Sequence, residues 1–345
     1  NKAAKAQQVV GGTTVSSFEP KSEKTNPNIP ERSGEESPSQ TLPQVPPQTQ
    51  QIPPPTSSQP QTPQQAQPHP TVREFRHRAE VPMLVLGGIL TVLAVVACIF
   101  VILLGMSLSE FGQGVLVGIL APALAFFAIR WFYWSAITNA VEVTPAQFPE
   151  VYTIYHDLAQ QMGFRPDAAG KGITRLPRLY IKNGNGVMNA YASKCQVSRG
   201  YVVIHSDLVD VGYTYQDWEF VRFVLAHELG HIKCGHVDLW RSMIRPVTTA
   251  LRLQASVIRA QEYTADRVAL YYAPAGGKGM IHLYCGKHLG HRVNMDEYFA
   301  SVHAHKDGFW IKVANFLSDH AVGFRRMAAL HEAETKGWDV HGKML

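Results

Sequence analysis

The chain has 345 residues, enough for one or two domains, and its 32 basic and 27 acidic residues leave a mild net charge of +5. No long basic run accompanies this charge, which argues against a nucleic-acid partner. The four cysteines form no CxxC pair and no regular framework, which argues against a disulfide scaffold and favours a reducing compartment.

The first 80 residues differ sharply in composition from the rest. They hold 14 of the 22 prolines, together with many Gln, Ser and Thr and few large apolar side chains. Such a segment buries too little apolar surface to offset the entropy of ordering it, so we predict that residues 1–80 form a disordered tail. Its proline runs between Gln40 and Pro70 are typical of extended spacers and sometimes of ligands for aromatic grooves, so the tail is a candidate site for other proteins.

Two apolar stretches follow the tail. Val81–Met106 contains no charged residue and is longer than the ~20 residues that a helix needs to cross the hydrocarbon core. Phe111–Trp134 is uncharged until Arg130 and ends in four aromatic residues, which are typical of membrane interfaces. We therefore predict two transmembrane helices within residues 81–134 and a lipid bilayer as a partner. A buried hairpin of a soluble protein is the alternative.

Positive charges indicate the orientation of these helices. Arg73, Arg76 and Arg78 precede the first stretch and Arg130 lies at the end of the second, whereas the connection Ser107–Gly114 has no Lys or Arg. Basic residues accumulate on the cytoplasmic side of membrane proteins. We therefore expect the N-terminal tail and the domain that follows the two helices to lie in the cytoplasm.

Residues 135–345 have the pattern of a globular domain. Short, partly alternating segments bounded by turn residues predict strands at 176–181, 187–193 and 201–205. Apolar residues at helical spacing predict helices at 144–163, 215–234, 255–272, 277–288, 310–317 and 324–334. In the helix 215–234, Thr214 and Asp217 resemble a capping box at the start. The predicted fold class is α+β, mainly helical with a small sheet.

The strongest chemical motif lies in the predicted helix 215–234. It reads His227-Glu228-Leu229-Gly230-His231, which places two imidazoles one turn apart on one helix face, where they can bind one zinc ion. Glu228 then stands where it can accept a proton from a metal-bound water. A surface helix with a chance motif is the alternative. The apolar turns before it favour a buried helix, and buried His and Glu side chains need partners.

A third ligand is expected because catalytic zinc sites use three protein ligands and keep the fourth position open. Glu262 and Asp266 are four residues apart on one face of the predicted helix 255–272, so Glu262 is the candidate ligand and Asp266 a candidate partner that orients His227. Two solvated acids on an exposed helix are the alternative. His236 is offset by one residue from a three-histidine motif, so we expect it to be structural, and Cys234 to be a packed thiol.

Together, the sequences HELGH at 227–231 and EYTAD at 262–266 resemble those of the HtpX and CAAX prenyl protease family of membrane zinc endopeptidases. The resemblance implies a zincin-like domain with one Zn²⁺ per chain. The segment Asn189, Ala190, Tyr191 and Ala192 resembles the family's NAFA-like element, which implies an edge strand that pairs with the substrate backbone. His320 and Arg326 resemble its HPxxxxRIxxL-like segment, which implies oxyanion stabilisation by His320 and support of the metal site or of His320 by Arg326.

The sequence thus predicts three parts: a tail at 1–80, two transmembrane helices at 81–134 and a zinc metallopeptidase domain at 135–345. The predicted function is hydrolysis of polypeptides by a membrane-anchored zinc endopeptidase, acting on membrane or misfolded proteins at the cytoplasmic face. One alternative is a catalytically inactive, zinc-stabilised interaction protein, and another is a zinc hydrolase with a non-peptide substrate. Glu228 favours an enzyme, because a scaffold has no need of a general base beside the metal.

Overall fold

The computed structural model describes residues 69–105, 108–166, 175–196, 199–305, 308–318 and 323–344. All of them belong to one compact unit, Gln67–Leu345. Most of the predicted tail lies outside the described residues, but its last part corrects the predicted boundary at residue 80. Helix α1 (Val72–Phe75) places the fully buried Phe75 against Tyr271, Tyr272 and Trp338. One aromatic anchor orders this segment, although its average composition is that of a tail.

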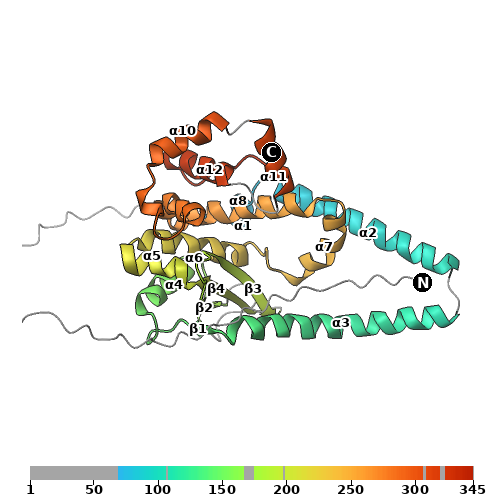
Figure 1. Ribbon diagram of the computed structural model, residues 1–345. Coiled ribbons are helices and arrows are strands. Elements are labelled where there is room, and N and C mark those ends of the chain that lie inside the picture. Colours follow the sequence, from blue (N-terminus) through green and yellow to red (C-terminus); the bar gives the residue numbers. More distant parts are fainter. Residues whose placement is uncertain are drawn as a thin grey trace, which may run out of the picture. The chain divides into compact units, whose positions relative to one another are not determined.

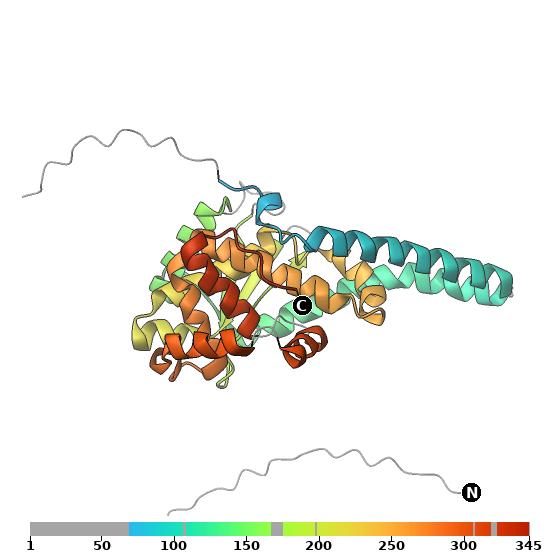
Figure 2. The ribbon, with the colours of Figure 1, turned by 90° about the horizontal axis from the view of Figure 1, so that it is seen from above.

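Two long helices follow and extend away from the rest of the unit, α2 (Glu80–Gly105) and α3 (Leu108–Ile137) (Figures 1 and 2). Within the described residues, α2 is the one helix that is long and apolar enough to cross a membrane, and little of it is buried. The predicted second stretch, 111–134, lies in α3, and its crossing of a membrane stays a prediction. The two-helix transmembrane hairpin is therefore not confirmed by the described part of the chain.

A four-stranded sheet has the order β1-β2-β4-β3. Its strands are β1 (Ala140–Glu142), β2 (Arg178–Lys182), β3 (Ala190–Gln196) and β4 (Arg199–His205). The β2–β4 pair is parallel, whereas β1 runs antiparallel to β2 and β3 antiparallel to β4. The three predicted strands are confirmed with small shifts, and β1 was not predicted. In this sheet β3 is an edge strand.

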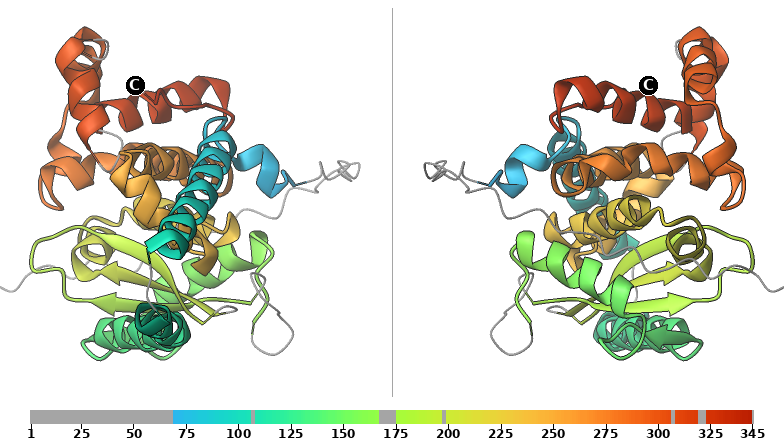
Figure 3. Two further views of the ribbon diagram at one scale, coloured as in Figure 1. Left: turned by 90° about the vertical axis from the view of Figure 1, so that its right-hand side faces the viewer. Right: turned by 90° about the vertical axis from the view of Figure 1, so that its left-hand side faces the viewer.

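The sheet is a layer between α3 on one face and the helices of the domain on the other (Figure 3). On the α3 side, Tyr133 packs with the sheet residues Tyr180, Tyr201 and Val203. On the opposite side, Val202 and Ile204 belong to the main hydrophobic core. The alternation of side chains along β4 therefore explains why one short strand contributes to both clusters.

Most predicted helices of the domain are confirmed. The helices are α4 (Pro149–Gln161), α5 (Ser206–Tyr215), α6 (Trp218–Lys233), α7 (Leu239–Ala250), α8 (Gln254–Tyr272), α9 (His282–Cys285), α10 (Met295–His305), α11 (Phe309–Leu317) and α12 (Gly323–Lys336). Short 3₁₀ segments are η3 (Pro274–Ile281) and η4 (Gly290–Arg292). Helices α5, α7 and α10 were not predicted. The expected α+β class, mainly helical with a small sheet, agrees with this architecture.

Two helix predictions need correction. The helix that carries the HELGH motif begins at Trp218, because the Asp217 side chain accepts a hydrogen bond from the Phe220 amide and caps it, while Thr214 lies in α5. The predicted helix 277–288 is instead mostly 3₁₀. Its glycines lie against α6 so closely that a Cβ on Gly276 would stand 2.0 Å from the Glu219 carbonyl oxygen. Because the backbone of residues 274–281 packs directly against α6, this segment forms 3₁₀ turns and not the predicted α-helix.

Helices α6 and α8 lie side by side and carry the motifs at 227–231 and 262–266 (Figure 1). Gly230 makes their close approach possible, because a Cβ there would stand 3.1 Å from the Val268 Cβ and 3.2 Å from its Cγ1. The motif faces of both helices are buried. The two motifs are about thirty residues apart in the sequence, and the packing of α6 against α8 makes them face each other.

The end of α6 has a specific turn. Gly235 has a φ of +69°, its amide bonds the carbonyl of Ile232, and the amide of His236 bonds the carbonyl of His231. This is a Schellman motif, in which the residue after the left-handed glycine folds back over the last helical turn. The turn therefore brings His236 next to His231.

Candidate metal centre

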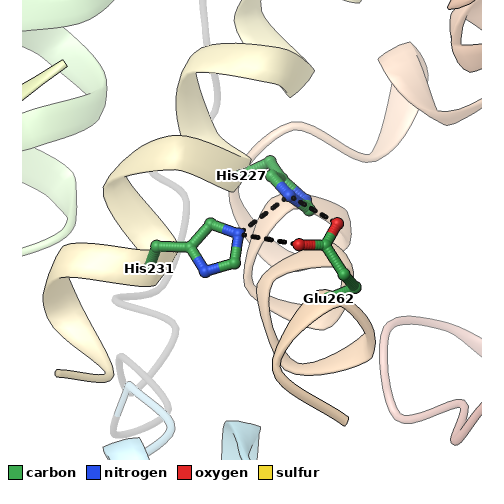
Figure 4. A group of neighbouring side chains, drawn as sticks. All are labelled: His227, His231 and Glu262. Carbon is green, nitrogen blue, oxygen red and sulfur yellow. Dashed lines mark hydrogen bonds and ion pairs between the residues drawn. The ribbon is translucent and has the colours of Figure 1, made fainter. Parts of the chain in front are cut away.

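Three side chains from α6 and α8 converge at their contact: His227, His231 and Glu262 (Figure 4). The two histidine Nε2 atoms are 3.1 Å apart. The carboxylate oxygens of Glu262 lie 3.6 Å from Nε2 of His227 and 3.5 Å from Nε2 of His231. The ligand set expected from the sequence therefore lies in one place, with each donor atom turned toward the other two.

These separations fit a single metal ion. Ligand bonds of about 2.0–2.1 Å at tetrahedral angles put neighbouring donor atoms roughly 3.3 Å apart. The three observed separations, 3.1, 3.5 and 3.6 Å, lie close to this value. Two imidazoles and a carboxylate are also a donor set that binds divalent transition metals and leaves a fourth position for water or substrate.

Asp266 and Arg326 stand behind this group. Nδ1 of His227 lies 2.9 Å from Oδ1 of Asp266, as expected for a carboxylate that orients a ligand histidine. Arg326 donates to both oxygens of Asp266, at 2.8 Å and 2.6 Å, and its Nη1 lies 3.2 Å from Glu262. Arg326 therefore contacts both acids of α8, and all of these side chains are buried.

The protonation of the two histidines differs without a metal. Burial lowers the pKa of His227, but hydrogen bonds with Asp266 and Glu262 outweigh it and raise the pKa to about 9. Burial and the positive charge of His227 hold the pKa of His231 well below its ordinary value. A proton on His227 thus compensates the acidic side chains, and a divalent ion would displace it on binding.

Glu228 lies beside the same centre and is buried. Burial is the main cause that raises its pKa to about 7, with the charge of Glu262 adding to the effect and that of His227 opposing it. The backbone of Ala192, on the edge strand β3, hydrogen-bonds its carboxylate. The side chain is therefore held between the motif helix and the strand that the resemblance implies for substrate.

A cavity of about 550 Å³ opens onto these residues. Its lining includes the whole expected strand element, namely Asn189, Ala190, Tyr191 and Ala192, together with His227, Glu228, His231, Glu262 and Arg326. The expected strand element and the candidate ligands therefore border one cavity. His320, the residue expected to stabilise an oxyanion, lies outside the described residues.

His236, which the sequence predicts to be structural and not a ligand, lies against the metal centre, a position that the sequence reasoning did not predict. Its Nδ1 lies 2.8 Å from Nδ1 of His231, on the side of that ring opposite the three-ligand group. The available signal was Gly235, because a glycine directly after a helix predicts a left-handed turn that returns the next residue to the last turn. Cys234, expected to be a packed thiol, is buried.

Residues 145–250 match the model of peptidase family M48. This stretch, about a third of the chain, is thus similar to M48 peptidases. The match contains the HELGH motif, whereas Glu262, Asp266 and Arg326 lie beyond it. The predicted resemblance to HtpX-type metallopeptidases is thereby confirmed.

Two relatives agree with the M48 assignment. Plastoglobule-localized metallopeptidase 48 of Arabidopsis thaliana is 30% identical over 112 residues, which are 28% of this chain and 31% of that protein. A protease HtpX homolog of Aeropyrum pernix is 27% identical over 197 residues, which are 56% of this chain and 52% of that protein. The chain thus spans less than two thirds of either relative. No solved structure matches the chain.

Proposed function

We propose that this chain is a zinc-dependent endopeptidase anchored in a membrane. The observation that supports it most is the convergence of His227, His231 and Glu262, with Glu228 beside them in the cavity that β3 borders. Two histidines and one glutamate are a ligand set that occurs in catalytic zinc sites. When bound, zinc would supply the Lewis acid that polarises the scissile carbonyl and makes a water molecule more acidic.

Glu228 is the proposed general base. Its carboxylate would accept a proton from the attacking water and return it to the leaving amine, which is general acid–base catalysis by one group. Burial raises the pKa of the Glu228 carboxyl in the metal-free site, which makes it a stronger base than an exposed glutamate. His320 is proposed to donate to the oxyanion, as the resemblance implies.

The edge strand β3 is the proposed substrate platform. Residues 189–192 line the cavity, and a polypeptide added alongside them would place its backbone within reach of Glu228. This mode of binding recognises the main chain, so it suits unfolded or misfolded polypeptides rather than one folded partner. Strand addition thus supports an endopeptidase of broad specificity.

Helix α2 supports the membrane anchor, because it is long, apolar and little buried. A second crossing by α3 is part of the proposal, with the N-terminal tail and the domain on the cytoplasmic side, where basic residues accumulate. The lipid bilayer and membrane or misfolded polypeptides are then the proposed partners, and the tail remains a candidate site for other proteins.

A paired assay tests the proposal on the full chain in detergent. The wild type should contain one zinc ion per chain and digest casein. Glu228→Gln should keep the zinc and lose roughly 10²–10⁴-fold in activity, the usual contribution of a general base. Zinc without proteolysis in the wild type would favour the inactive interaction protein, and full activity of Glu228→Gln would remove Glu228 from the mechanism.

A further inference from the structure

A buried carboxylate at the first residue of α2 lies beside the histidine that contacts His231. Glu80 is fully buried. Its Oε1 accepts hydrogen bonds from Arg76, at 2.9 Å, and Arg241, at 3.1 Å, while its Oε2 accepts one from the Thr264 hydroxyl, at 2.7 Å. Two guanidinium groups and a hydroxyl therefore hold this carboxylate in place and compensate the cost of burying its charge.

His236 lies between Glu80 and the metal centre. Its Nε2 lies at an ion-pair distance of 3.3 Å from Oε1 of Glu80 without the geometry of a hydrogen bond, and its Nδ1 lies 2.8 Å from Nδ1 of His231. The imidazole is almost completely buried. The atoms thus form a continuous series from the carboxylate of Glu80, through the ring of His236, to the ring of His231.

The protons of this series have one arrangement that permits metal binding. If Nε2 of His231 binds a metal as a neutral imidazole, its Nδ1 carries the hydrogen and donates to Nδ1 of His236. His236 then carries its own hydrogen on Nε2, the atom that faces Glu80. A carboxylate 3.3 Å away stabilises this tautomer, because its negative charge attracts the hydrogen on Nε2 and it has no hydrogen of its own to donate.

We propose that Glu80 and His236 are positioning residues for His231, so that the start of the membrane-anchoring helix α2 is part of the support of the metal centre. The inference rests on the proposed function, because it needs His231 as a metal ligand. Without His236, the Nδ1–H of His231 loses its acceptor in a buried place. Without the charge of Glu80, His236 can adopt the tautomer that carries its hydrogen on Nδ1. That hydrogen would face the Nδ1–H of His231 and turn the His231 ring.

The test compares matched variants of the full chain in detergent. His236→Leu removes the acceptor and keeps a buried apolar side chain, and His236→Gln restores an amide oxygen that can accept from His231. The control is His77→Leu, because His77 is a buried histidine next to the start of α2 whose Nε2 meets the carbonyl of Gly342 and not the metal centre. Glu80→Gln keeps the shape of the carboxylate and removes its charge.

Two readouts are used, zinc affinity against a competing chelator and the absorption spectrum of the cobalt-substituted protein. Loss of a group that orients a ligand typically lowers metal affinity about 10–100-fold. We expect a loss of this size in His236→Leu, a smaller loss in Glu80→Gln, partial recovery in His236→Gln, and no change in His77→Leu. The cobalt spectrum should change in His236→Leu and keep its wild-type form in His77→Leu.

Two results would overturn the inference. One is zinc affinity at the wild-type level in His236→Leu, and the other is an equal loss in His77→Leu, which would trace the effect to the fold of the N-terminal segment. A wild type that binds no zinc would instead contradict the proposed function itself. Wild-type zinc binding and casein digestion with an unaffected His236→Leu would contradict the inference alone.

Discussion

The two histidines of the metal centre are supported in different ways. His227 meets the carboxylate of Asp266 directly, and Asp266 lies one helical turn from the proposed ligand Glu262 on α8. His231 meets a second imidazole first, and the carboxylate behind that imidazole belongs to Glu80, at the start of α2. One support is local to the domain, whereas the other connects the domain to its proposed anchor. To bind a metal, each histidine must be neutral and in a fixed tautomer. For His227 the supporting carboxylate lies within the domain, and for His231 it lies at the start of α2.

The largest effect is expected where the local support is broken. Arg326 contacts both Asp266 and Glu262, so Arg326→Met removes one of the two cations that face these buried carboxylates and leaves only the protonated His227. Removing one partner of a buried charge pair costs about 3–5 kcal/mol. The free energy of unfolding, measured by urea titration with a chelator present, should fall by this amount.

Arg325→Met is the matched control for this change. Arg325 is the preceding residue of α12 and is equally buried, but no carboxylate pairs with it among the described residues. Its replacement should cost far less than that of Arg326. Equal losses in the two variants would show that burial of a long side chain, and not the pairing of the two acids, stabilises this side of the centre.

A smaller effect compares the two carboxylates directly. Asp266→Asn and Glu80→Gln each replace a charged acceptor by a neutral one of the same shape. Because Asp266 touches its histidine and Glu80 acts through a second ring, Asp266→Asn should lower zinc affinity by about 10–100-fold and Glu80→Gln by less. Competition with a chromogenic chelator measures both. A larger loss in Glu80→Gln would reverse the ranking of the two supports.

The same difference in range explains how much the sequence could predict. His227, His231, Glu262 and Asp266 were found because each pair has helical spacing, and spacing within a helix fixes which side chains share a face. Glu80 could not be found in this way. Its partners lie on α7, α8 and the turn after α6, and only the packing of these elements brings them together.

The fold shows a similar division. Strands β2 to β4 follow from alternation and the helices α4, α6, α8 and α12 from helical periodicity, whereas the ordered segment at 72–80 was assigned to the tail. Its composition is polar, but the single side chain of Phe75 and the hydrogen bonds from Arg267 to the carbonyls of Glu74 and Phe75 hold it on α8. Averages over many residues do not reveal a single anchor, and tertiary contacts decide such a boundary.

The smallest expected effect concerns the turn that makes the long-range support possible. Gly235 has a φ of +69°, and a Cβ there would stand 2.6 Å from the carboxylate of Asp238. Gly235→Ala should therefore cost about 1–2 kcal/mol of stability, the usual cost of a left-handed non-glycine residue. It should also shift His236 away from His231 and lower zinc affinity, measured as above.

Gly163→Ala separates the cost of the backbone from the loss of the support. Gly163 also has a positive φ, +82°, and follows α4, but a Cβ there would meet no atom within 4 Å. Its replacement should cost a similar amount of stability and leave zinc affinity unchanged. If the two variants bind zinc equally well, the turn at Gly235 does not position His231, and the contrast between a local and a long-range support loses its structural basis.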